Sequence, residues 1–292
     1  MKVLITGNKG FVGTVTQRFF ENAGLEVCGY DIMDNYDIRD IAQFERIVQE
    51  VRPERILHLA AVSRFADADK NQVLSDETNT HGTKNVALIA GKYHIPTVYS
   101  STGSVYMPII EEPPITEEFR ALGNSEYATT KRKGELYLQK FAYPWMILRY
   151  AHLYGSEKRM HGLIGGYLDR IKFGMAPVLY GGKQSNDFCY VDDVAEANYL
   201  AITAPYDKWG QIYNIGTGEE LSAEAAGDII IKIYNEFYPK NKFKGKVEKR
   251  EQRGVDPSRF VYNIDIAQRM LGFKAKYSFE EGLRKMFEIL SI

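Results

Sequence analysis

The chain has 292 residues, of which 45% are hydrophobic and 26% charged, a composition that excludes a mainly disordered protein. Its 37 Lys and Arg residues against 38 Asp and Glu residues give a formal net charge of -1, so the chain as a whole lacks the cationic field that attracts nucleic acid or an anionic membrane. Two distant cysteines, Cys28 and Cys189, exclude a disulfide framework, and no apolar stretch is long enough to span a bilayer. We expect a cytoplasmic protein whose partners are neither nucleic acids nor membranes.

The first half of the chain alternates short apolar runs with helical patterns. The apolar runs predicted as strands are 3–5, 27–30, 56–59, 97–99 and 146–148, and the predicted helices are about 11–22, 41–51, 75–93 and 125–141. Continuous apolar runs are typical of parallel strands that helices cover on both faces. The predicted fold class is therefore α/β, with a Rossmann-type doubly wound parallel sheet.

Beyond Gly155 the pattern is less regular, because glycine pairs interrupt shorter elements. Helices are predicted near 193–203, 222–237 and 279–289. We expect residues 1–155 to form a dinucleotide-binding domain, with returning segments near 186–216, and residues 156–292 to form a smaller, interleaved substrate-binding lobe. The ligand is then expected between the two parts, beside the carboxyl ends of the strands.

A glycine-rich turn, TGNKGFVG at 6–13, directly follows the first predicted strand. Gly7 permits the turn out of the strand, Gly10 lets the backbone approach a pyrophosphate, and Gly13 lets the next helix pack closely on the sheet. The pyrophosphate then lies at the N-terminus of that helix. Asp31 follows the second strand, where a carboxylate can accept both ribose hydroxyls and repels a 2′-phosphate, which favours NAD over NADP.

Tyr127 and Lys131 are four residues apart in the helix predicted at 125–141, so their side chains share one face. A neighbouring ammonium group stabilises tyrosinate, and we therefore expect the pKa of Tyr127 to fall from ~10 and its phenol to relay a proton. Small hydroxyl side chains follow the strand at 97–99. We select Thr102 as the one that hydrogen-bonds the substrate oxygen.

These motifs together resemble the extended short-chain dehydrogenase/reductase family, in particular its NAD-dependent nucleotide-sugar epimerases and dehydratases. Further marks of the resemblance are HLAA at 58–61, NTHGT at 79–83, SSTGSVY at 100–106, YATTK at 127–131, LRYAHLYG at 148–155 and DFCYVDDVAEA at 187–197. The resemblance covers nearly the whole chain. It implies a nucleotide-sugar substrate, and a homodimer formed through the helices at about 75–93 and 125–141.

The resemblance also implies a set of site residues. The residues assigned to NAD are Gly7, Asn8, Lys9, Gly10, Phe11, Val12, Gly13, Asp31, Asp37, Ile38, Leu59, Ala60, Ala61, Ser100, Tyr127, Lys131 and Tyr150. Among them, Asp37 and Ile38 are expected near the adenine, and Lys131 also at the nicotinamide ribose. Asn79 joins Tyr127, Lys131 and Thr102 in the catalytic set, where it positions the active-site helix and a water. The residues assigned to the substrate are Ser63, Thr102, Ser104, His152, Asn186 and Arg253.

The reaction implied by the resemblance is reversible hydride transfer at the sugar C4, with Tyr127 moving the hydroxyl proton. A 4,6-dehydratase of the family carries an acidic pair after the catalytic threonine, where this chain has Gly103 and Ser104, so dehydration is disfavoured. A GDP-fucose-synthase-type 3,5-epimerase uses a cysteine at the place of Ser104 and a second acid near His161, and serine is too weak an acid to replace that cysteine. We therefore favour a 4-epimerase, with a 4-ketoreductase as the alternative.

Two departures from the family pattern affect the substrate. His152 stands where the family has an asparagine, and Asn186 stands where it has an arginine. In the family, that asparagine and that arginine usually contact the nucleotide sugar. Either Arg253, with Lys183 or Arg259, holds the diphosphate instead, or the enzyme is a dehydrogenase of a small unactivated substrate. A non-catalytic dinucleotide sensor is a further alternative, against which the intact tyrosine and lysine pair argues. The five histidines show no metal-ligand spacing, so we predict no metal.

Overall fold

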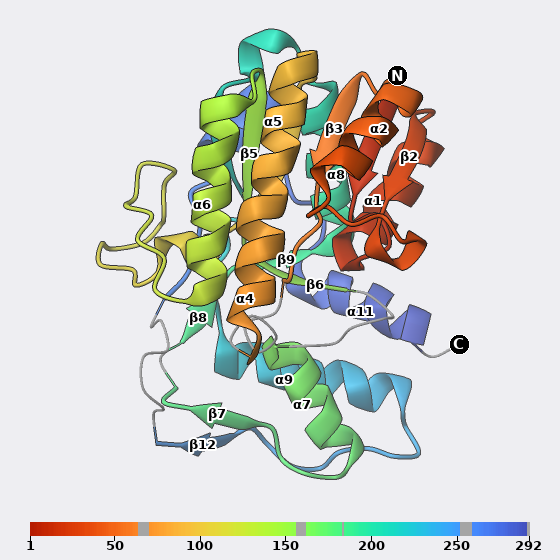
Figure 1. Ribbon diagram of the computed structural model, residues 1–292. Helices are drawn as coiled ribbons and strands as arrows, with labels where there is room; N and C mark the ends of the chain where they lie inside the picture. The colour runs from red at the N-terminus through yellow and green to blue at the C-terminus, as the bar shows by residue number, and fades with distance from the viewer. Residues whose placement is uncertain (64–69, 156–161, 183, 252–258, 291–292) are drawn as a thin grey trace.

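The computed structural model describes residues 1–63, 70–155, 162–182, 184–251 and 259–290. A six-stranded parallel sheet organises the first part of the chain (Figure 1). Its strands are β1 (Lys2–Thr6), β2 (Glu26–Tyr30), β3 (Arg55–His58), β4 (Thr97–Thr102), β5 (Trp145–Tyr150) and β10 (Gln211–Ile215). The order is β10-β5-β4-β3-β1-β2, and every neighbouring pair is parallel. This confirms the predicted Rossmann-type α/β fold, and the order reverses between β1 and β3, where such sheets bind ligands at their carboxyl edge.

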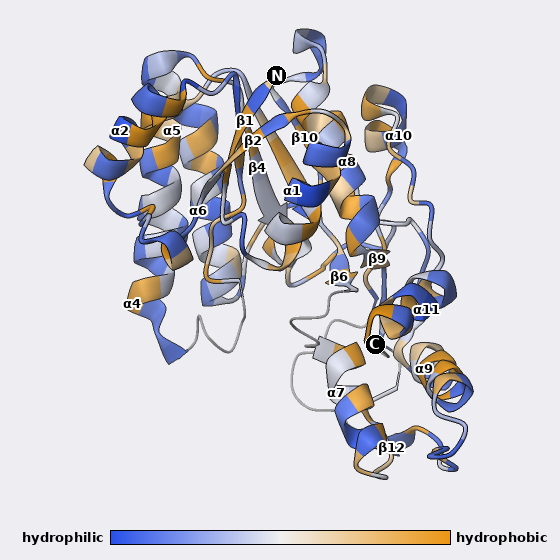
Figure 2. Ribbon diagram, turned by 90° about the vertical axis from the view of Figure 1, so that its right-hand side faces the viewer, coloured by the Kyte–Doolittle hydropathy of each residue, from blue (hydrophilic) through white to orange (hydrophobic). Residues whose placement is uncertain are grey.

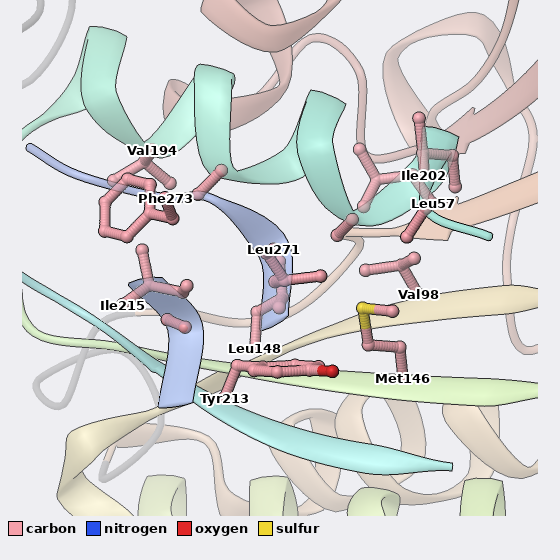
Figure 3. Packing of buried hydrophobic residues seen from close by; sticks show 14 of the residues in the cluster. Leu57, Val98, Met146, Leu148, Val194, Ile202, Tyr213, Ile215, Leu271 and Phe273 are labelled. Carbon is pink, nitrogen blue, oxygen red and sulfur yellow. The ribbon is translucent and has the colours of Figure 1, made fainter. Parts of the chain in front are cut away.

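Both faces of the sheet are apolar and covered. The covering helices are α1 (Phe11–Asn22) and α8 (Val191–Thr203) on one face, and α2 (Ile41–Val51), α5 (Thr83–Tyr93) and α6 (Glu126–Phe141) on the other. Under α8, Val98, Met146 and Leu148 pack together (Figure 3). On the opposite face Tyr99 and Ile147, the next residue of each strand, are equally buried. Because successive strand residues point to opposite faces and both are buried, the strands appear in the sequence as continuous apolar runs.

The later part of the chain builds a smaller lobe beyond the carboxyl edge of the sheet (Figures 1 and 2). Its elements are β6 (His152–Tyr154), α7 (Gly162–Lys172), β7 (Val178–Tyr180), β8 (Ser185–Asn186), β9 (Phe188–Tyr190), β11 (Leu221–Ser222), α9 (Ala223–Phe237), β12 (Glu248–Arg250) and α11 (Phe279–Leu290). Helices α7, α9 and α11 surround their own core, which includes Ile164, Ile230 and Leu283. The chain returns to the core of the sheet at α8, at β10 and again at α10 (Asp265–Leu271). None of the helices in the described ranges is both long and apolar enough to cross a bilayer.

The helix predicted at 75–93 is present but irregular. It starts as α4 (Gln72–Ser75), continues as a π-helical segment, η2 (Asp76–Gly82), and ends as α5. A π-helical turn changes the direction in which its side chains point and is frequent at functional sites. Here the buried side chain of Asn79 forms hydrogen bonds with Val62, in the loop after β3, and with Thr130 of α6.

Candidate active site

The glycine-rich turn connects β1 to α1 at the carboxyl edge of the sheet. Gly7 has a φ of +73°, and a Cβ at this residue would lie 2.7 Å from the backbone nitrogen of Ala60. A Cβ at Gly13 would lie 2.1 Å from the carbonyl oxygen of Gly7. Helix α1 begins after Gly10, which supplies no side-chain cap, so the amides of the first turn are open to an anion. The turn therefore fits a pyrophosphate.

Asp31 lies beside this turn, at the end of β2, and is 7% exposed. Its Oδ2 accepts a hydrogen bond from the backbone nitrogen of Lys9 at 3.0 Å, and its Oδ1 accepts one from that of Met33 at 3.0 Å. The Lys9 ammonium is paired with Asp34, so its charge is already balanced. A fixed carboxylate here can accept ribose hydroxyls and repels a 2′-phosphate, and the residues therefore fit NAD better than NADP.

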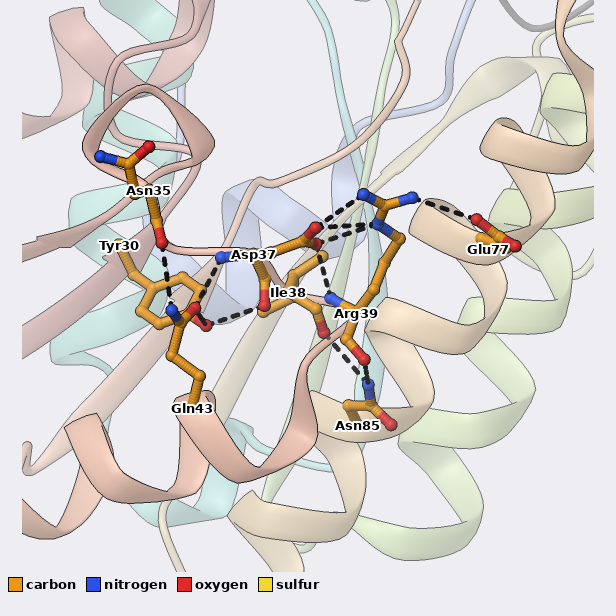
Figure 4. A network of polar contacts seen from close by, with 8 residues as sticks. All are labelled: Tyr30, Asn35, Asp37, Ile38, Arg39, Gln43, Glu77 and Asn85. Carbon is orange, nitrogen blue, oxygen red and sulfur yellow. Dashed lines mark hydrogen bonds and ion pairs between the residues drawn. The ribbon is translucent and has the colours of Figure 1, made fainter.

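Asp37 and Ile38 follow in a segment held by a network of hydrogen bonds and ion pairs (Figure 4). Tyr30 donates its hydroxyl to the carbonyl of Asp37 at 2.9 Å, and Asn85 donates to the carbonyl of Ile38 at 3.1 Å. The carboxylate of Asp37 accepts hydrogen bonds from the Arg39 guanidinium, which holds the pKa of that carboxyl below its usual range. These contacts fix the residues that the resemblance assigns to the adenine between β2 and α5.

The other residues assigned to the cofactor lie at the ends of β3, β4 and β5, on the same edge. The backbone nitrogen of Ala60 donates to Thr6 Oγ1 at 3.3 Å, which ties the loop containing Leu59, Ala60 and Ala61 to the end of β1. Ser100 is buried within β4. Tyr150 ends β5 and donates its hydroxyl to Asn198 of α8 at 2.6 Å.

Tyr127 and Thr102 meet at this edge. Tyr127 lies in the first turn of α6 and Thr102 ends β4, close enough for the Thr102 side chain to influence the pKa of the phenol. Burial raises the pKa of Tyr127 to about 12, although the nearby Thr102 hydroxyl lowers it in part. This direction is opposite to the lowering expected from the four-residue spacing. The reason is that burial disfavours the charged phenolate and is the largest influence on this pKa.

Lys131 lies one turn further along α6 and is 2% exposed. Its Nζ is 4.4 Å from the ring centre of Tyr99, a cation–π contact. Burial lowers the pKa of Lys131 to about 7, and Glu135 raises it in part. His58, in the same region, bonds Thr6 Oγ1 through Nδ1 at 2.7 Å and Thr83 Oγ1 through Nε2 at 2.9 Å, and burial lowers its pKa to about 3. His58 is therefore a neutral, fully bonded residue of the core.

Asn79 connects the loop after β3 to α6. Its Oδ1 accepts a hydrogen bond from the backbone nitrogen of Val62 at 2.7 Å, and its Nδ2 donates to Val62 O at 3.1 Å and to Thr130 Oγ1 at 3.2 Å. Thr130 precedes Lys131 directly. Asn79 thus fixes the position of α6 relative to the loop that contains Ala60.

A buried ion pair under the site was missed by the sequence analysis. Glu135 is fully buried and accepts two hydrogen bonds from Arg149 of β5, at 2.8 and 2.7 Å, one from Arg132 at 2.7 Å and one from Ser101 at 2.6 Å. Arg149 is 2% exposed. The available signal was the position of Glu135, four residues after Lys131 and hence on the same helix face.

The residues assigned to the substrate are more scattered. Ser63 is exposed after β3, and Ser104 lies with its Oγ 3.2 Å from Thr102 Oγ1. His152 of β6 contacts the ring of Phe260 edge-on at 5.2 Å. Its side chain is exposed to solvent.

Asn186 lies in β8, opposite Leu221 of β11. Arg253, Lys183 and His161 lie outside the described residues. Arg259 forms two hydrogen bonds of 2.7 Å to Glu220, so the protein itself balances its charge and it is not available as an unpaired cation for a diphosphate. Within the described ranges no group of three or more His, Cys, Asp or Glu residues could hold a metal ion.

Comparisons with known proteins agree with this geometry. Residues 3–216 match the model of the NAD dependent epimerase/dehydratase family. A Methanocaldococcus jannaschii protein with the provisional name UDP-glucose 4-epimerase is 30% identical over 97% of this chain and 96% of its own. The dTDP-glucose 4,6-dehydratase of Salmonella typhimurium is 25% identical over 99% of this chain and 92% of its own.

Two solved structures are also similar. The UDP-glucose 4-epimerase of Thermotoga maritima with UDP-glucose has a TM-score of 0.87 and 26% identity, covering 99% of this chain and 98% of its own. The UDP-glucose 4-epimerase of Thermus thermophilus in complex with NAD has a TM-score of 0.83 and 27% identity, covering 99% of each chain. Fold and site together define an NAD-dependent enzyme built on a Rossmann-type sheet. The chain belongs to the NAD dependent epimerase/dehydratase family, within the extended short-chain dehydrogenases/reductases.

Proposed function

We propose that the protein is a 4-epimerase of a nucleotide-linked sugar. The observation that carries the proposal is that Tyr127, in the first turn of α6, and Thr102, at the end of β4, meet at the same sheet edge as the glycine-rich turn, with the buried Lys131 one turn further along α6. A sugar hydroxyl placed between Tyr127 and Thr102 meets one group that transfers a proton and one that orients its oxygen.

The proposed mechanism gives each side chain one task. Tyr127, as phenolate, takes the proton of the C4 hydroxyl and later returns it. Thr102 hydrogen-bonds the same oxygen, and Lys131, when protonated, stabilises the phenolate. Held by the glycine-rich turn and Asp31, NAD would supply the acceptor for the C4 hydride and a positive charge that favours phenolate. The 4-keto sugar would turn over in the site before hydride and proton return, so that the hydride reaches the opposite face and C4 is inverted. Asn79 keeps α6, and with it Tyr127, in place against the loop after β3.

Epimerisation is favoured over two neighbouring reactions. Dehydration needs an acid and a base next to Thr102, and Gly103 and Ser104 supply neither. Net reduction by a 4-ketoreductase needs exchange of the coenzyme in every cycle, whereas an epimerase regenerates NAD. The relatives named as UDP-glucose 4-epimerases support the same choice.

Two measurements test the proposal. Purified protein incubated with UDP-glucose and no added coenzyme should form UDP-galactose, and denaturation should release NAD. Tyr127→Phe should lower turnover at least about a hundredfold while NAD stays bound, whereas Tyr143→Phe, at a site 70% exposed, should be unchanged. Turnover that depends on added reduced coenzyme and a 4-keto sugar would indicate the ketoreductase.

The identity of the nucleotide is open to a direct test, because His152 and Asn186 depart from the family pattern. UDP, GDP, dTDP or CDP at 100 times its dissociation constant should stabilise the protein by about 2.7 kcal/mol. We expect one of the four to raise the melting temperature. If none does, a small unactivated substrate replaces the nucleotide sugar, and NAD binding without any turnover would indicate a sensor.

We also propose a homodimer formed through α5 and α6. Leu136 on α6 is 51% exposed, which an apolar interface would cover. Light scattering should give twice the chain mass, and Leu136→Lys should shift the protein toward monomers. An unchanged dimer in this variant would place the interface elsewhere.

A further inference from the structure

The end of the C-terminal lobe farthest from the sheet exposes apolar side chains. We call this region the lobe tip and define it as residues 170–176, at the end of α7, and residues 239–247, between α9 and β12 (Figures 1 and 2). Phe173 is 79% exposed and Met175 is 45% exposed. Such side chains cost free energy in water unless a partner covers them.

The second segment of the lobe tip presents lysines in a regular pattern. Lysine occupies every second position from 240 to 246, and all four side chains are exposed. Phe243 and Val247, at the alternate positions, pack against the core of the lobe. Asn235 fixes this arrangement, since its Nδ2 donates to Phe243 O at 2.9 Å and its Oδ1 accepts from Phe243 N at 2.7 Å. The lysines are therefore held on the outer side of an anchored segment.

The two segments of the lobe tip meet in one cavity. Lys172 of α7 and Lys242 and Lys244 of the second segment line it, together with the apolar walls of Ile171 and Phe243. No acidic residue lines it. Within the described parts of the chain, none of the five lysines of the lobe tip lies within ion-pair distance of a carboxylate, so their ammonium groups are open to a partner.

We propose that the lobe tip binds the surface of an anionic phospholipid bilayer. Phe173 and Met175 enter the interface between headgroups and acyl chains, while the lysines contact the headgroups and keep their ammonium groups in water. A basic cluster next to an exposed aromatic and a thioether fits this boundary, where polar and apolar surfaces lie side by side. A nucleic acid would leave Met175 without a base to stack on.

The proposal does not depend on the proposed function, because the lobe tip contains none of the residues placed at the active site. It departs from the expectation of no membrane partner, which rested on the net charge of the whole chain. That charge is an average, whereas a charged surface acts over about one Debye length, ~8 to 10 Å, and attracts the lysines nearest to it.

The test uses the full chain and sedimentation with vesicles. Vesicles of equal parts phosphatidylserine and phosphatidylcholine should bind the protein, phosphatidylcholine alone should not, and added salt should release it. Replacing Lys242 and Lys244 with glutamine should weaken binding about 25-fold, at roughly fivefold per lysine. Phe173→Ser should weaken it about tenfold or more. The matched control replaces Lys140 and Lys274, exposed lysines elsewhere, with glutamine and should bind like the wild type.

Depth of insertion gives an independent readout. Phe173→Trp should show a blue-shifted emission with anionic vesicles and quenching by brominated lipid. Equal binding to neutral vesicles, equal losses in the control variant, or an unshifted tryptophan would overturn the proposal. Binding to an RNA oligonucleotide in place of the vesicles would overturn it as well and assign the lobe tip to nucleic acid. Activity on UDP-glucose is measured separately, so failure here leaves the proposed function untouched.

Discussion

Replacing Lys131 with methionine tests whether a desolvated ammonium group lies in the active site. Lys131 is 2% exposed, and burial lowers its pKa from 10.5 to about 7. The unfolded chain keeps the higher value, so between these two pH values it binds more protons than the native protein. Stability therefore rises with pH in this window. A difference of about 3.5 pKa units corresponds to a destabilisation of about 5 kcal/mol when the lysine is protonated in both states.

Lys131→Met removes this penalty but keeps most of the length and apolar surface of the side chain. The free energy of unfolding at pH 7 should increase by about 2 to 4 kcal/mol, less than the full amount because the contact with Tyr99 is lost. Turnover should fall at least about a hundredfold, since the phenolate loses its cation. Urea unfolding at pH values from about 6 to 9 measures the effect, and the gap between variant and wild type should narrow above pH 7.

Lys133→Met is the matched control. The Lys133 side chain is 47% exposed and pairs with Asp76 at 2.9 Å, and its pKa is raised. Its stabilising contribution is fully present below the unfolded pKa, so it is constant from pH 6 to 9 and worth at most about 1 kcal/mol. If both variants show the same dependence of stability on pH, the argument for a desolvated Lys131 is refuted.

Three further changes test the surrounding structure. Glu135→Gln leaves the Arg149 guanidinium buried without its counter-charge and should lower the free energy of unfolding in urea by about 3 to 5 kcal/mol. Arg132→Gln removes only the partly exposed partner and should lower it by less than about 1 kcal/mol. Equal losses in the two variants would contradict this account. Gly13→Ala places a Cβ 2.1 Å from the carbonyl oxygen of Gly7 and should abolish the rise in melting temperature caused by NAD. If the variant still binds NAD, this prediction is wrong. Asp31→Ser removes the charge that repels a 2′-phosphate and should narrow the preference for NAD over NADP, measured by calorimetry; an unchanged preference would place the discrimination elsewhere.

The fold and the nucleotide turn were predictable because their signals are local. Gly7, Gly10 and Gly13 follow one strand and precede one helix, and Asp31 follows the next strand, so short-range geometry is enough to bring them together. The spacing of Tyr127 and Lys131 likewise needs only a regular helix. The π-helical segment that directs Asn79 was not predictable, because its sequence also suits an ordinary helix.

Electrostatic consequences were harder to predict than positions. A charged residue in a sequence is assigned to the surface by default, yet Glu135 and Arg149 are both buried, since α6 packs over β5 and each neutralises the other. The pKa of Tyr127 depends on how much protein surrounds the phenol. That quantity is set by tertiary packing and leaves no local signal in the sequence, so the spacing of Tyr127 and Lys131 could not predict how far burial raises the pKa of the phenol.

One face of α6 explains why the lysine of the site has a low pKa despite a nearby carboxylate. Tyr127, Lys131 and Glu135 follow at four-residue intervals, so the carboxylate lies one turn from the ammonium. Arg149 and Arg132 already donate hydrogen bonds to Glu135, so these two arginines balance most of its negative charge. Lys131 is left with the aromatic face of Tyr99, which attracts a cation more weakly than a free carboxylate does. In the proposed reaction, the pKa of Lys131 therefore lies near neutral pH. Its charge can respond to the phenolate that forms beside it.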